Sequence, residues 1–153
     1  MLRTDWQMND KRMDNGDYVL ADQIGHLLRL ANQRHLEIFV RLMPDLTPTQ
    51  FALLVALRDL GDTSQNELGR HIGIDAATTN GVVERLLKKQ YIHSSTDPND
   101  KRRLRLSLTA TGLHIVEQSI PLAQTITRDT LDGLTQRESS RLLQLLKKLQ
   151  PPA

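Results

Sequence analysis

The 153-residue chain contains no cysteine, and only 3% of its residues are aromatic. The absence of cysteine excludes disulfides, thiolate metal sites and thiol-based redox sensing, and it favours a cytoplasmic location. Because aromatic rings are scarce, leucine, isoleucine, valine and alanine must build the core. No stretch approaches 18 consecutive apolar residues, so no membrane-spanning helix is expected. Residues 1–16 are polar and lack the apolar centre of a secretory signal, so we expect a flexible N-terminal arm.

The sequence also lacks the motifs of the common enzyme classes. It has no Ser-His-Asp motif set, no glycine-rich phosphate loop and no pair of carboxylates typical of acid–base catalysis. Its five histidines are scattered, and only His114 with Glu117 has a helical spacing suited to a shared metal ion. We therefore expect no enzymatic activity, no cofactor and no metal site.

Positive charge is concentrated in one part of the chain. Residues 85–105 contain seven lysines or arginines against two aspartates, whereas residues 1–84 carry a net negative charge. A local excess of this kind suits a surface that faces phosphates, although a solvated face is the plain alternative. The surrounding motifs favour the phosphate-facing surface.

Helix-capping signals divide most of the chain into short elements. The Ser/Thr-x-x-Glu/Gln pattern of a capping box occurs at 47–50, 64–67 and 135–138. Apolar residues at helical spacing, together with these caps, predict helices over 17–43, 47–60, 64–73, 75–90, 109–131 and 135–149. Pro121 is expected to bend the fifth of these.

The middle of the chain has the pattern of a winged helix-turn-helix. Within 64–89, a short helix is followed by a tight turn at Gly73 and a second helix. Residues 91–96 are predicted to form a strand, Asp-Pro-Asn-Asp at 97–100 is a turn cluster, and 103–108 alternates apolar and polar side chains. The result is a β-hairpin with a basic tip directly after the second helix, which is a wing.

The sequence thus predicts a mainly α fold with a small β-hairpin wing. The winged helix-turn-helix DNA-binding domain is expected at 47–108, between helical dimerisation regions at 17–46 and 109–150. The apolar faces of these flanking helices are too wide for a core of about 60 residues to cover, so we expect an isologous homodimer. A monomeric helical bundle is the alternative.

The second helix of the motif is expected to enter the major groove by its N-terminal half. The side chains there are small, or carry a hydroxyl or an amide, and they comprise Ala77, Thr78, Thr79 and Asn80. Asn80 suits bidentate recognition of adenine, and threonine can donate or accept at a base edge. Ser64 and Gln65, at the start of the first helix, suit phosphate contacts. For the threonines, ordinary helix surface is the alternative.

The wing tip is expected to reach a minor groove. Its sequence is Asp100-Lys101-Arg102-Arg103, and a long cation at such a tip suits the negative potential of a narrow groove. Asp100 is expected to hold the Arg102 guanidinium by a forked pair. Arg85 and Lys88, on the second helix, are expected to contact phosphates or to support the structure.

The chain resembles the MarR family of winged helix-turn-helix regulators. The resemblance is carried by LTPTQFALL (46–54), SQNELGRHIGID (64–75), VVERLLKKQYI (82–92) and DPNDKRRLRLSLTATG (97–112). It implies a homodimer, a palindromic duplex DNA operator and repression relieved by a small ligand, with Arg102 in the minor groove. Gly81, where many members carry a larger or basic residue, and Ala77, which lacks a common hydroxyl, depart from the family pattern.

The end of the long first helix is expected to bind an effector. IGHLLRLANQRHLEIF (24–39) resembles members that control the breakdown of hydroxylated aromatic or nicotinate-type acids. An arginine in a partly apolar pocket suits a carboxylate, and the residues proposed for a small aromatic acid are Arg34, His35, Ile38, Phe39 and Phe51. Alternatively, Arg34 pairs with Glu37 or with an acidic residue of the partner copy, and His35 is an interface histidine. A regulator without a small ligand, or one that responds to metal, is the corresponding alternative for function.

Overall fold

A computed structural model describes residues 18–150, so the expected arm at 1–16 lies outside the described residues. The chain divides into two compact units, with the boundary between Arg34 and His35. In the first unit, a 3-10 turn η2 (Leu20–Asp22) precedes the first part of α1 (Ile24–Leu42). The expectation that this helix begins at residue 17 is wrong, because Val19 supplies no side-chain cap and Gln23 is extended between η2 and α1.

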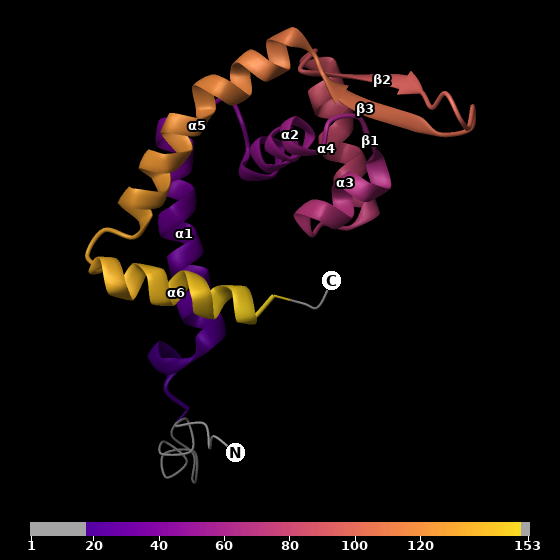
Figure 1. Ribbon diagram of the computed structural model, residues 1–153. Coiled ribbons are helices and arrows are strands. Elements are labelled where there is room, and N and C mark those ends of the chain that lie inside the picture. The colour runs from indigo at the N-terminus through magenta and orange to yellow at the C-terminus, as the bar shows by residue number, and fades with distance from the viewer. Residues whose placement is uncertain (1–17, 151–153) are drawn as a thin grey trace. The chain divides into compact units, whose positions relative to one another are not determined.

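The second unit contains the end of α1 and the remaining elements (Figure 1). Its helices are α2 (Pro48–Leu60), α3 (Gln65–Ile72), α4 (Ala76–Lys88), α5 (Ala110–Thr130) and α6 (Gln136–Lys148). These bounds confirm the predicted helices to within about two residues at most ends. Pro121, expected to bend its helix, lies inside α5, which continues through it as one helix.

All three predicted capping boxes are present. At Thr47, the hydroxyl oxygen accepts from the Gln50 amide at 3.2 Å, and the Thr47 amide donates to the Gln50 side chain at 3.1 Å. Ser64 and Thr135 make the same reciprocal bonds with the glutamates three residues later. Each box satisfies amides that an α-helix leaves unpaired at its start, so the sequence sets where α2, α3 and α6 begin.

The wing belongs to a three-stranded antiparallel sheet with strand order β1-β3-β2. The hairpin strands are β2 (Ile92–Thr96) and β3 (Leu104–Leu108), and Ser94 lies opposite Leu106. The additional strand, β1 (Thr63–Ser64), lies just before α3 and pairs with β3 through Thr63 opposite Leu106. The hairpin extends away from the helices in Figure 1.

The core of the second unit is aliphatic, as the composition requires. Its most deeply buried hydrophobic side chains come from α2, α3, α4 and α5, and they are Leu53, Leu54, Leu57, Leu68, Leu86, Val116 and Ile126. Helix α2 packs on α3, α5 and β3, so it lies at the centre of the unit. The helix-turn-helix is therefore held on a rigid support.

Helix α6 is amphipathic but leaves its apolar face uncovered. Four leucines of α6 and the leucine at its C-cap have side chains that are between 37% and 66% exposed. They are Leu142, Leu143, Leu145, Leu146 and, at the cap, Leu149. Among residues 35–150, no other helix or strand packs extensively on α6. No helix in the described range 18–150 is long and apolar enough to cross a membrane.

Candidate nucleic-acid interface

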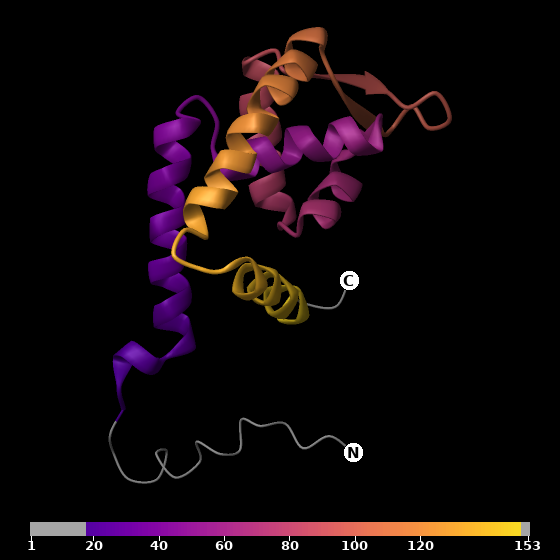
Figure 2. The ribbon, with the colours of Figure 1, turned by 60° about the vertical axis from the view of Figure 1, so that its left-hand side comes forward.

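Helices α3 and α4 form a helix-turn-helix (Figure 2). A polar side chain caps the N-terminus of each helix. Hydrogen bonds from the Ser64 hydroxyl, and then from Thr63, lower the pKa of Glu67 below its usual value. Gly73 ends α3 in the left-handed conformation, at φ 73°. Asp75 then caps α4 by accepting from the Thr78 amide at 2.8 Å, and this bond lowers the pKa of the Asp75 carboxyl. Both carboxylates are thus held ionised and stabilise helix N-termini.

The crossing of α3 and α4 depends on Gly69 and Thr79. A Cβ atom added to Gly69 would lie 2.5 Å from the Thr79 hydroxyl oxygen, so the two helices meet where the first has no side chain. Thr79 is only 1% exposed, and its hydroxyl donates to the Asp75 carbonyl at 2.7 Å. The expectation that Thr79 faces DNA is therefore corrected, because its side chain packs inside the motif.

The outer surface of α4 carries the other predicted base-reading residues. Ala77, Thr78 and Asn80 are exposed. The Thr78 hydroxyl donates to the Asp75 carboxylate at 2.7 Å, which leaves its oxygen lone pairs as acceptors. Gln65, from α3, donates to the Asn80 side chain at 3.3 Å, so the two helices present one joined polar surface.

Basic side chains follow on the same helix. Arg85 and Lys88 are exposed in its last turn. Positive charge near a helix C-terminus also stabilises the helix, so both residues have a structural role as well as a charge suited to phosphates.

The base of the wing is held together by Asp97. Its carboxylate accepts from the Asn99 amide at 2.8 Å and lies 3.5 Å from the Arg105 guanidinium. These contacts, the Asn99 bond foremost, lower the pKa of Asp97. Arg105 also donates to the Asp62 carbonyl, just before β1. Arg105 is therefore a structural residue of the wing.

The wing tip differs from the expectation at one contact. Asp100 accepts from the Arg102 backbone amide at 3.0 Å, and its second oxygen lies 3.2 Å from Nε of Arg103. The expected pair between Asp100 and the Arg102 guanidinium is therefore wrong, because the tight turn directs the next arginine toward the carboxylate. Lys101, Arg102 and Arg103 are all exposed. The turn thus fixes the backbone of Arg102 and leaves its side chain pointing into solvent.

The residues predicted to bind an effector are distributed between the surface and the core. Arg34 is exposed in the first unit. In the second unit, His35 is half-buried, whereas Ile38 and Phe39 are buried. The rings of His35 and Phe39 are 6.1 Å apart, and those of Phe39 and Phe51 are 6.4 Å apart. The structure thus places the Phe39 ring near the rings of both His35 and Phe51.

A hydrogen bond to Thr130 places a proton on Nδ1 of His35. Thr130 donates its hydroxyl proton to the Ile126 carbonyl at 2.7 Å, so its oxygen is left to accept. Nδ1 of His35 lies 3.1 Å from that oxygen and therefore carries the proton. In the neutral tautomer with this proton on Nδ1, Nε2 is an acceptor.

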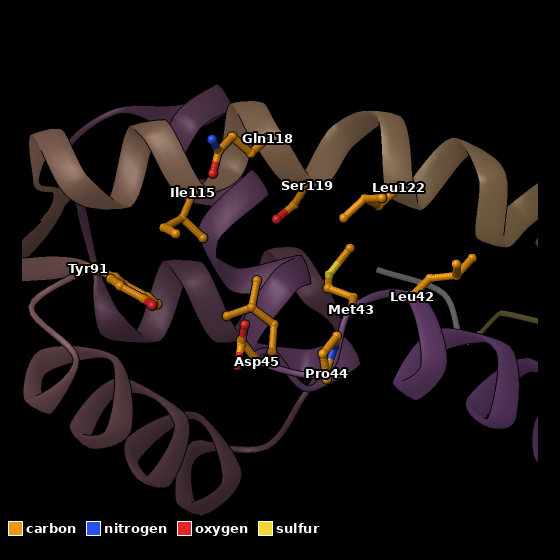
Figure 3. A pocket seen from close by; sticks show the side chains of 10 residues that line it. Leu42, Met43, Pro44, Asp45, Tyr91, Ile115, Gln118, Ser119 and Leu122 are labelled. Carbon is orange, nitrogen blue, oxygen red and sulfur yellow. The ribbon is translucent and has the colours of Figure 1, made fainter.

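Sequence reasoning missed a cavity of about 170 Å³ between the α1–α2 turn and α5 (Figure 3). None of the predicted effector residues lines it. Its lining combines apolar side chains with Asp45, Tyr91, Gln118 and Ser119. Ser119 is 6% exposed, and its hydroxyl points into the space that faces Met43 in Figure 3. No local pattern could have revealed this cavity, because its walls come from three separate stretches of sequence.

The described residues 18–150 contain no group of three histidine, cysteine or acidic side chains placed to hold a metal ion.

The comparisons with known proteins agree with this geometry. The model of the MarR family matches residues 46–104. The transcriptional repressor NicR of Pseudomonas putida is 40% identical over 139 residues, which is 90% of this chain and 88% of NicR. The structure of Bordetella bronchiseptica BpsR, described for the regulation of its DNA binding by 6-hydroxynicotinic acid, is 40% identical with a TM-score of 0.86 and covers 90% of this chain and 100% of BpsR.

A structure that includes nucleic acid is also similar. It is a cysteine-to-serine mutant of Escherichia coli MarR with operator DNA, 28% identical, with a TM-score of 0.79 over 90% of this chain and 100% of that one. The mainly helical fold, the wing and these matches establish one conclusion: the chain belongs to the MarR family of winged-helix transcriptional regulators.

Proposed function

We propose that this chain is a ligand-responsive repressor, which binds a palindromic duplex operator as a homodimer and is released by a small aromatic acid. The observation that carries the DNA-binding part is the arrangement of two exposed surfaces, the outer face of α4 and the cationic wing tip, on one rigid unit. Such an arrangement suits simultaneous contact with a major groove and the neighbouring minor groove.

The exposed leucines of α6 support the homodimer. An apolar helix face of this width is unfavourable in water, and a second copy of the chain is the simplest cover for it. In the first unit, α1 likewise exposes Ile24, Leu27, Leu28 and Leu30. A two-fold dimer would present two copies of α4 to half-sites about 34 Å apart on one face of DNA, which is why the operator is proposed to be palindromic.

Two observations support an aromatic acid as the effector. BpsR, 40% identical over nearly the whole chain, has its DNA binding regulated by 6-hydroxynicotinic acid. In this chain, Nε2 of His35 is an acceptor that suits a ring hydroxyl or ring N–H, and Arg34, its neighbour in sequence, suits a carboxylate. Hydroxylated benzoate, cinnamate and nicotinate share both chemical groups.

The test is a titration of DNA binding with and without candidate acids. Duplexes selected from a random pool by the purified protein would first define the operator. Fluorescence anisotropy at several salt concentrations then measures affinity, and 6-hydroxynicotinate, 4-hydroxybenzoate and hydroxycinnamates are added at saturation. We expect one of them to raise the melting temperature of the free protein and to weaken operator binding about 10-fold or more, since a ligand acts only by its preference for one conformation.

Three outcomes separate the parts of this proposal. Selection of non-palindromic sites, or a monomer bound with full affinity, would contradict the dimeric repressor. Stabilisation without weaker operator binding would contradict the inducer role. Failure of every acid to stabilise the protein would favour a regulator that acts without a small ligand.

A further inference from the structure

The side-chain amide of Asn80 is held at both ends in the free protein. Its Nδ2 donates to Oε1 of Glu84 at 2.9 Å, one turn further along α4. Its Oδ1 accepts from Nε2 of Gln65, on α3, at 3.3 Å. All three residues lie at or near the protein surface, so this chain of hydrogen bonds crosses the outer face of the helix-turn-helix.

The carboxylate of Glu84 gives this chain a direction. An ionised carboxylate only accepts hydrogen bonds, so the nitrogen end of the Asn80 amide, and not the oxygen end, must face Glu84. The amide of Gln65 can present either end, and it therefore follows Asn80 by turning its own nitrogen toward Oδ1. Glu84 thus sets the donor-to-acceptor direction of the hydrogen bonds that join Gln65, Asn80 and Glu84.

The held amide keeps half of its hydrogen-bonding capacity. An asparagine side chain has two N–H donors and two lone pairs on its oxygen, and Glu84 and Gln65 each use one. One donor and one acceptor remain. Adenine presents the complementary pair in the major groove, because N7 accepts and N6 donates.

We propose that Glu84 and Gln65 are positioning residues that fix the Asn80 amide for bidentate recognition of one adenine in each operator half-site. This inference deepens the proposed function and rests on its DNA-binding part. Holding the amide in one orientation before binding removes the entropy of ordering it at the interface. It also disfavours guanine, whose O6 and N7 are both acceptors and offer no donor to the remaining lone pair of the Asn80 carbonyl oxygen.

Removal of the Glu84 charge should have different effects on general DNA affinity and on the preference for adenine. A carboxylate near the phosphates of DNA lowers affinity for every sequence, so its removal should not weaken general binding. Glu84→Gln keeps the length of the side chain, but the glutamine amide can present either end to Asn80. The variant should therefore bind duplex DNA at least as tightly as the wild type while showing a weaker preference for adenine.

The experiment begins with site selection by the wild type and by Asn80→Ala, so that the position read by Asn80 is the one whose adenine preference disappears. Duplexes with adenine, guanine or 7-deazaadenine at that position are then titrated at fixed salt. 7-Deazaadenine lacks the N7 acceptor. We expect a loss of about 10-fold or more in wild-type affinity for both replacements, no loss for Asn80→Ala, and a clearly smaller loss for Glu84→Gln.

Glu117→Gln is the matched control, because it removes the same charge from an exposed residue of α5, outside the helix-turn-helix. It should keep the full adenine preference. If Glu84→Gln also keeps the full preference and the full 7-deazaadenine loss, Glu84 does not position the amide and the inference is overturned. If Asn80→Ala changes no position while both proteins bind DNA in a salt-sensitive manner, Asn80 reads no base, and the proposed function survives. Absence of wild-type binding to any duplex would instead contradict the proposed function itself.

Discussion

Gly112 approaches the backbone of Tyr91 so closely that a Cβ atom added to the glycine would lie 1.9 Å from the Tyr91 carbonyl oxygen. The same carbonyl accepts from the Thr109 amide at 3.0 Å, and the Thr109 hydroxyl donates to the Gln90 carbonyl at 2.7 Å. Thr109 and Gly112 therefore fasten the start of α5 to the residues that lead into β2. This contact explains why the Thr-x-x-Gly pattern follows the wing.

Gly112→Ala should destabilise the protein strongly. The new methyl group would meet backbone atoms, which cannot rotate away as a side chain can, so α5 or the start of β2 must shift. We expect the free energy of unfolding in urea to fall by about 3 kcal/mol or more. Gly81→Ala is the control, because Gly81 lies inside α4 with no atom within 4 Å of the added Cβ, and it should gain about 0.5–1 kcal/mol. Equal stability of the two variants would contradict this account.

The two neighbouring arginines of the wing tip should respond differently to truncation. Arg102→Ala is expected to lower operator affinity about 10-fold or more and to make its salt dependence shallower, because the exposed guanidinium is proposed to enter the minor groove. Arg103 already pairs with Asp100 at 3.2 Å, so Arg103→Ala should have the smaller effect on affinity. Anisotropy titrations across a range of salt concentrations measure both. A larger effect for Arg103 would contradict the proposal that Arg102 is the arginine that enters the groove.

Stability should decline at acidic pH through three helix-capping carboxyl groups and one at the base of the wing. Hydrogen bonds in the folded chain, in each case chiefly from a neighbouring serine, threonine or asparagine, lower the pKa of four carboxyl groups, which are Glu67, Asp75, Asp97 and Glu138. A depressed folded-state pKa gives stability that is complete above the unfolded pKa and is lost as pH falls through the folded one. Urea melts should therefore show the free energy of unfolding decreasing below about pH 4.

Substitutions in the capping box of α6 can show how much of the acid loss of stability comes from Glu138. Glu138 accepts from the Thr135 amide at 2.8 Å, and this bond is the main reason for its lowered pKa. Glu138→Gln should reduce the acid loss of stability. In a Thr135→Ala background, which removes the hydroxyl partner, the same substitution should change the acid loss less. Additive effects of the two substitutions would show that the Thr135 hydroxyl does not contribute, since the Thr135 backbone amide remains as a donor in both backgrounds.

Charged residues on the apolar face of α6 should separate the proposed dimer. The double variant Leu142→Glu/Leu146→Glu places two carboxylates where a second copy is expected to pack, and sedimentation should show a monomer with weakened operator binding. Gln144→Glu, which adds a carboxylate to the same helix, is the control and should remain a dimer. A dimer in the double variant would place the interface elsewhere.

The effector site should depend on Arg34 and not on the cavity of Figure 3. Arg34→Ala is expected to keep operator affinity and to lose the response to an aromatic acid, because no other group of the site suits a carboxylate as well. Ser119→Leu fills the cavity beside α5 and should keep that response. The opposite pair of results would assign the effector to the cavity.

The sequence predicted the elements whose signals are local. Capping boxes at Thr47, Ser64 and Thr135 marked three helix starts, and the alternation through 103–108 marked the inner wing strand. Strand β1 was missed because two residues have no periodicity. The start of the first helix was placed too early because apolar spacing continues past its true N-terminus.

The candidate site was predicted less completely, for a different reason. The position of α4 in the motif predicts which of its side chains are exposed. Thr79 is an exception, because it faces inward where Gly69 of α3 leaves room for it. Asp100 pairs with Arg103 because of the turn geometry, which the residue types alone do not determine. The partners of Asn80 come from one helix turn away and from another helix, so only the folded chain brings them together.

Strand β1 connects the wing to the helix-turn-helix. Ser64 is both the residue opposite Arg105 of β3 and the cap of α3, so a tilt of the hairpin pulls directly on the first turn of that helix. The wing and the first turn of α3 are thus joined through one residue, Ser64. An effector that shifts either part would therefore be expected to move the other part as well.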